Sequence, residues 1–147
     1  MNDYKHILVA VDFSTSTDQV LTKASNIAQR DKAKLTLMHV VEFLPPIDSI
    51  YGPIDANNWI INESEMLKHA EQSLQKLIEK KNLKNTDFKV RLGTPKHEIS
   101  QFVKDQQCDL VVMGSHGRHG ISALLGSTAN AVLHAMPCDI LTIKLER

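Results

Sequence analysis

The 147-residue sequence has no excess of charge of either sign, because Lys plus Arg and Asp plus Glu each number 17. Neutralisation of phosphates by basic side chains dominates the affinity of proteins for nucleic acid. We therefore expect no nucleic-acid partner. A net charge near zero also gives little repulsion against self-association.

Long hydrophobic runs are missing as well. No apolar run approaches the roughly 20 residues that span a bilayer, so we expect no membrane-spanning helix. The first six residues, MNDYKH, carry no basic segment followed by an apolar core, and no signal peptide is expected. Only two cysteines occur, Cys108 and Cys138, each at the edge of an apolar run. This usage favours buried structural thiols in a cytoplasmic protein over a disulfide or redox pair.

What is present is typical of a folded globular protein. Hydrophobic residues make up 42% of the chain and charged residues 23%. The length suits one domain, residues 1–147, with a substantial core, and no internal repeat or low-complexity tract interrupts it.

Strand and helix patterns alternate along the chain. Apolar or alternating runs predict strands at residues 7–11, 35–41, 88–92, 109–113 and 140–143. Apolar residues at helical spacing predict helices over 20–28, over 66–78 in about four turns, from Pro95 after a Thr94 cap, and up to Met136 before Pro137. The run at 88–92 alternates, which favours an edge strand.

This alternation predicts a three-layer α/β fold, an open parallel sheet of five strands in the order 3-2-1-4-5. With right-handed crossovers, the winding of the sheet then reverses between the first and fourth strands and leaves a crevice there. Ligands of open α/β sheets bind in such a crevice, outside the carboxyl ends of the strands. Asp12 follows the first strand and Gly114 follows the fourth. Both are predicted to face one crevice, although Asp12 could instead cap the next helix.

Residues 113–128 form a glycine-rich connection, MGSHGRHGISALLGST, between the fourth strand and a helix. Glycine allows close approach of the backbone, and a helix start offers unpaired N–H groups and the positive end of a dipole. A phosphate-bearing ligand is one interpretation. The segment is neither a Walker loop nor a Gly-x-Gly-x-x-Gly fingerprint, so a plain tight connection is the other interpretation.

The stretch over residues 43–62 combines Pro45, Pro46, Gly52 and Pro53 with several apolar side chains. A connection this long is usually functional or packed on something. A lid beside the ligand, a contact with a second subunit and a flap over the core are all open.

Several motifs together resemble the universal stress protein family over essentially the whole chain. They are KHILVAVDFS at residues 5–14, LMHV at 37–40, GTP at 93–95, MGSHG at 113–117, Gly126-Ser127, and PCDIL at 137–141. The resemblance implies a small cytoplasmic stress-response protein with a Rossmann-like nucleotide-binding fold. It also implies a homodimer, often formed by antiparallel pairing of the last strand, here Ile140, Leu141, Thr142 and Ile143.

The family divides into members that bind ATP and members that have lost the site. By resemblance, Asp12 and Val40 would line the adenosine end, with backbone contacts from Ala10 and Val11 and with Met113 on the pocket floor. The ribose and the phosphates, as ATP, ADP or AMP, would meet the loop residues Gly114, Gly117, Arg118, Gly126, Ser127 and Thr128. Asp12 could also help to hold a Mg²⁺ ion on the phosphates.

The loop departs from the family pattern in one respect. Nucleotide binders resemble Gly-x2-Gly-x9-Gly-Ser/Thr, whereas eight residues separate Gly117 from Gly126 here. Either the shorter loop moves Gly126 and Ser127 away from the distal phosphates, or it closes more tightly around them.

No catalytic machinery stands out in the sequence. His116 and His119 lie in the loop without partners at a spacing that indicates a metal site or a relay, and no Lys is placed as in a Walker loop. Three readings follow: an ATP-binding regulatory dimer, a stress-response interaction protein whose glycine loop is structural, and, less supported, a slow nucleotide hydrolase.

Overall fold

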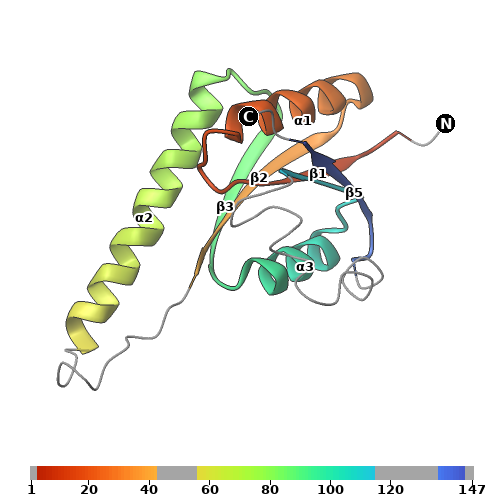
Figure 1. Ribbon diagram of the computed structural model, residues 1–147. Helices are drawn as coiled ribbons and strands as arrows, with labels where there is room; N and C mark the ends of the chain where they lie inside the picture. The colour runs from red at the N-terminus through yellow and green to blue at the C-terminus, as the bar shows by residue number, and fades with distance from the viewer. Residues whose placement is uncertain (1–2, 43–55, 115–135, 145–147) are drawn as a thin grey trace.

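The computed structural model describes residues 3–42, 56–114 and 136–144, and it contains a five-stranded parallel sheet in the order β3-β2-β1-β4-β5 (Figure 1). This is the predicted topology. In chain order the elements are β1 (His6–Ala10), α1 (Thr17–Asp31), β2 (Lys34–Glu42), α2 (Ala56–Lys80), β3 (Thr86–Gly93), α3 (Pro95–Gln106), β4 (Leu110–Gly114) and β5 (Asp139–Ile143).

Helices cover both faces of the sheet, with α1 and α2 on one side and α3 on the other (Figure 1). Alternate residues of β1 point to opposite faces: Ile7 and Val9 pack in the cluster with α1 and α2, and Leu8 and Ala10 pack in the cluster with α3. A strand covered on both faces must be apolar throughout, which explains the uninterrupted run in the sequence.

Helix α2 is longer than predicted, and one residue predicted on its buried face is exposed. It begins at Ala56 and has 25 residues, so the last part of the stretch predicted as irregular is helical; residues 43–55 lie outside the described ranges. Ala70 and Leu74 are buried, whereas Met66, predicted on the apolar face, is 52% exposed. The reason is position, because the amino-terminal half of α2 extends past the sheet (Figure 1).

The turn before α3 follows the prediction. β3 lies at the edge of the sheet, and α3 has Thr94 as its N-cap residue and Pro95 in its first turn, although the Thr94 side chain makes no capping bond. Gly93 has a φ of 151°, and a Cβ there would lie 3.0 Å from the Glu98 side chain. Glycine is therefore required at this position.

Two other predictions concern the second half of the chain. Cys108 and Cys138 are free thiols, the first buried and the second half-buried. Residues 115–135, which include most of the predicted final helix, lie outside the described ranges, but Met136 is described and buried. No helix within the described ranges is long and apolar enough to cross a membrane.

Candidate functional site

A hollow lies at the carboxyl ends of β1 and β4, where the winding of the sheet reverses direction. Its empty space is about 260 Å³, open solvent included, and it is lined by Val9, Ala10, Val11, Asp12, Ser16, Thr17, Val20 and Gly114. The neighbouring strands β1 and β4 supply its base and the start of α1 supplies one wall. This is the place where ligands bind in open α/β sheets.

Hydrogen bonds within the chain shape the turn between β1 and α1. The Asp12 carboxylate accepts the backbone N–H of Ser14 through Oδ1 at 3.0 Å. The hydroxyls of Ser14 and Ser16 lie 2.6 Å apart, and the Thr17 N–H donates to the Ser14 carbonyl at 3.1 Å. Ser16 is the N-cap residue of α1, so the interpretation of Asp12 as a helix cap is wrong. Asp12 instead stabilises the turn and borders the hollow.

The Thr17 hydroxyl is a buried polar group beside the hollow. Thr17 is 8% exposed, and its Oγ1 has no hydrogen-bond partner within the described part of the chain. The residue lines the hollow as the first residue of α1. Buried polar groups are nearly always hydrogen-bonded in folded proteins, and an exception calls for an explanation.

An aromatic pair connects the turn to β2. His39 Nδ1 donates to the Val11 carbonyl at 2.7 Å, which places the ring proton on that nitrogen. The Phe13 ring packs on the imidazole with centroids 4.6 Å apart, and Phe13 has a φ of 59°. The left-handed backbone at Phe13 turns the chain after β1 and thereby brings its ring onto His39.

The structure gathers part of the predicted site and leaves part undescribed. Ala10, Val11, Asp12 and Gly114 all line the hollow. Val40 and Met113 are also at the carboxyl ends of their strands, but they are at most 1% exposed and pack in the core cluster on the α3 face. The predicted residues Gly117, Arg118, Gly126, Ser127 and Thr128 lie outside the described ranges.

Sequence reasoning missed Ser16 and Thr17 as lining residues. Both belong to the polar run Ser14-Thr15-Ser16-Thr17, whose residue types are typical of helix caps. A signal was available in the spacing, because Thr17 precedes the buried Val20 and Leu21 by three and four residues and so shares their face of α1.

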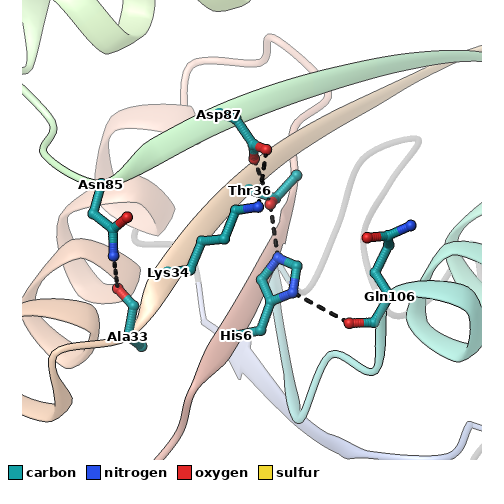
Figure 2. Close-up of polar contacts among 7 residues, drawn as sticks. All are labelled: His6, Ala33, Lys34, Thr36, Asn85, Asp87 and Gln106. Carbon is teal, nitrogen blue, oxygen red and sulfur yellow. Dashed lines mark hydrogen bonds and ion pairs between the residues drawn. The ribbon is translucent and has the colours of Figure 1, made fainter.

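A separate polar cluster, drawn in Figure 2, lies at the amino ends of β1, β2 and β3. Thr36 Oγ1 donates to Asp87 Oδ1 at 2.6 Å and therefore accepts from His6 Nε2 at 2.8 Å (Figure 2). Lys34 completes the cluster with an ion pair to Asp87 at 3.3 Å. These contacts tie β1, β2 and β3 together and satisfy the buried Thr36 hydroxyl, so we interpret the cluster as structural.

A second hollow also lies at the amino ends of the strands. It is formed by the end of α1, the start of β2 and the residues before β3, with Ala28, Ala33 and Leu35 among its lining and Lys32 and Lys84 beside them.

Across the described ranges, no group of three His, Cys, Asp or Glu side chains is arranged to hold a metal ion.

Comparison with known proteins gives a consistent result. The sequence model of the universal stress protein family matches residues 3–144. Universal stress protein A homolog 2 of Coxiella burnetii is 35% identical over 147 residues, 99% of each chain. The structure of universal stress protein UspA from Lactobacillus plantarum superposes with a TM-score of 0.70 at 30% identity, covering 97% of this chain and 99% of that one.

Two solved structures of similar fold contain adenine nucleotides. One is a universal stress protein in complex with cAMP, with a TM-score of 0.62 and 22% identity over 97% of this chain and 98% of that one. The other is the universal stress protein from Archaeoglobus fulgidus in complex with dAMP, with a TM-score of 0.53 and 20% identity over 97% of this chain and all of that one. At these identities the likeness shows a common fold.

Proposed function

Because the chain belongs to the universal stress protein family, we propose that it is a cytoplasmic regulator of the stress response that binds an adenine nucleotide as a homodimer. The observation that carries the proposal is the hollow bordered by Asp12 and Gly114 at the reversal point of the sheet. Adenine nucleotides in two proteins of the same fold support this choice of ligand.

In this proposal the β1 and β2 ends hold the adenosine and the glycine-rich segment holds the phosphates. Asp12 offers carboxylate oxygens for ribose hydroxyls or for a Mg²⁺ ion on the phosphates. Backbone N–H groups around Gly114 and Gly117 and at the helix start after Gly126 would supply the anion contacts. Occupancy acts as a signal only to the extent that the nucleotide binds two states of the protein with different affinity.

Equilibrium titration with a fluorescent ATP analogue tests the proposal. The wild-type protein is expected to bind saturably. Gly117→Val, which places a branched side chain where close backbone approach is proposed, is expected to lose at least tenfold in affinity. Asp105→Asn on the exposed face of α3 is the control and should bind like wild type. Absence of saturable binding to the folded wild type would favour the interaction protein with a structural glycine loop.

The same samples distinguish a binder from an enzyme. We expect ATP turnover no faster than that of the Gly117→Val protein, because no nucleophile or Walker lysine is placed for hydrolysis. Turnover clearly above that of the variant would establish the slow hydrolase.

The proposed dimer uses the edge strand β5. The charged side chain of β5 is that of Asp139 at its first position, and the uncharged Ile140, Leu141 and Thr142 follow it along this edge. The other edge strand, β3, exposes Lys89 and Arg91, and charged side chains on an edge oppose pairing with a second chain. The charge pattern therefore favours association through β5 over association through β3.

A further inference from the structure

The start of α1 combines two features that point to an occupant of the hollow. Thr17 lines the hollow and is 92% buried, since its exposed fraction is 8%, and its Oγ1 has no hydrogen-bond partner among the described residues. Burying a hydroxyl without a partner destabilises a fold. A ligand oxygen that accepts from this hydroxyl would remove the penalty in the bound state.

The second feature is the amino end of the helix itself. Helix α1 has 15 residues, and its N-cap residue Ser16 makes no side-chain hydrogen bond to the helix. The Ser16 hydroxyl is instead paired with Ser14 Oγ. The Thr17 N–H donates to the Ser14 carbonyl, so it is the next N–H groups of the first turn that lack a side-chain cap at the positive end of the helix dipole.

We propose that the Thr17 hydroxyl and the amino end of α1 bind a phosphate oxygen of the nucleotide. This assignment rests on the proposed function and adds to it a phosphate contact on the β1 side of the crevice. A hydroxyl donor beside uncapped N–H groups favours a ligand atom that accepts hydrogen bonds, and an anionic oxygen is the strongest such acceptor.

Two carboxylates near the start of α1 would repel a polyphosphate. Asp12 borders the hollow, although its Oδ1 is engaged by the Ser14 N–H, and Asp18 in the first turn is exposed. Titrations are therefore run with excess Mg²⁺, which offsets repulsion between these carboxylates and a polyphosphate.

Calorimetric titration of adenosine, AMP and ATP into Thr17→Val, Thr17→Ser and the wild type tests the assignment. Valine keeps the shape and removes the hydroxyl. We expect Thr17→Val to bind AMP or ATP at least tenfold more weakly, since a hydrogen bond to a charged group is lost, and to bind adenosine within about twofold of wild type. Thr17→Ser should stay within about threefold for all ligands.

Thermal unfolding separates this role from a structural one. Thr17→Val is expected to melt at or above the temperature of the wild type, because an unpaired buried polar group is removed. Thr36→Val is the matched control, because this threonine is also buried but is hydrogen-bonded to His6 and Asp87 at the amino ends of the strands. It should melt at a lower temperature and keep its nucleotide affinity.

Four outcomes overturn the assignment. Unchanged affinity of Thr17→Val for both nucleotides shows that no phosphate contact exists. An equal loss of affinity of Thr17→Val for adenosine shows that the hydroxyl contacts the sugar or a bound water instead of a phosphate. A comparable loss in Thr36→Val assigns the effect to folding. A folded wild type that binds no nucleotide refutes the proposed function as well, whereas the first three outcomes leave that function standing.

Discussion

At the scale of single residues, burial changes the acidity of the two thiols. Burial raises the pKa of Cys108 from about 9 to about 12 and that of Cys138 to about 11. Since the thiolate is the reactive form, both should react slowly with a thiol reagent at pH 8 and rapidly in urea. Cys138, which is half-buried, should react before Cys108. The time course of labelling with and without urea, with Cys138→Ser as the control, measures this; equal fast labelling of the native protein would contradict it.

The same burial predicts a loss of stability at high pH. Above about pH 9 the thiols of the unfolded chain ionise, while the raised pKa of Cys108 keeps its thiol protonated in the folded state until about pH 12. The unfolded state then binds fewer protons, so the free energy of unfolding falls as the pH rises. Urea midpoints at pH 7 and pH 10 should therefore differ more in wild type than in Cys108→Ala. An identical difference in both proteins would count against this account.

Single residues also show what the sequence could reveal about the site. Asp12 and Gly114 could be placed at one crevice because each follows an apolar strand and the two strands are neighbours. The spacing of Thr17 places it on the buried face of α1, but its position beside the hollow and its lack of a hydrogen-bond partner among the described residues depend on how α1 packs on β1. The residue that carries our inference is thus one that only tertiary structure singles out.

At the scale of elements, α2 offers a direct test of packing. Leu74 is fully buried in the cluster between α1, α2 and the sheet, whereas Met66 on the same helix is 52% exposed. We expect Leu74→Ala to lower the free energy of unfolding by about 2–5 kcal/mol, and Met66→Ala to change it by at most about 0.5 kcal/mol. Urea denaturation measures both, and a cost for Met66→Ala equal to that for Leu74→Ala would refute the described exposure.

The elements differ in how well they could be predicted. The central strands β1 and β4 were evident because strands buried on both faces are apolar throughout, and α3 was bounded by Thr94 and Pro95. The start of α2 was missed because its first residues follow three prolines and a glycine, and Met66 was misplaced because helical spacing alone does not say where the sheet ends.

At the scale of the whole molecule, the proposed dimer makes a prediction about β5. Thr142 is exposed on this edge strand, and a Thr142→Lys change places like charges near each other across an antiparallel pair, which disfavours pairing. Sedimentation equilibrium at micromolar concentration should show a dimer for wild type and a shift toward monomer for Thr142→Lys. Arg91→Glu on the opposite edge strand is the control and should remain dimeric. A wild type that is monomeric throughout would contradict the proposal.

The topology itself followed from the order of elements. The connections between parallel strands are right-handed crossovers, so helices cover both faces of the sheet only if the winding direction reverses once. The order 3-2-1-4-5 places that reversal between β1 and β4, as found. The glycine-rich segment that would complete the site lies among residues 115–128, outside the described ranges, so its contacts remain part of the proposal.

The central claim is that the hollow between β1 and β4 is where an adenine nucleotide binds. The most direct test is a titration of ATP with Mg²⁺ into ¹⁵N-labelled protein, followed by amide chemical shifts. We predict saturable shifts at Asp12, Thr17 and Gly114, with Lys32, Lys84 and Asn85 around the second hollow unchanged. Shifts that do not saturate, or that concentrate around the second hollow, would contradict the claim.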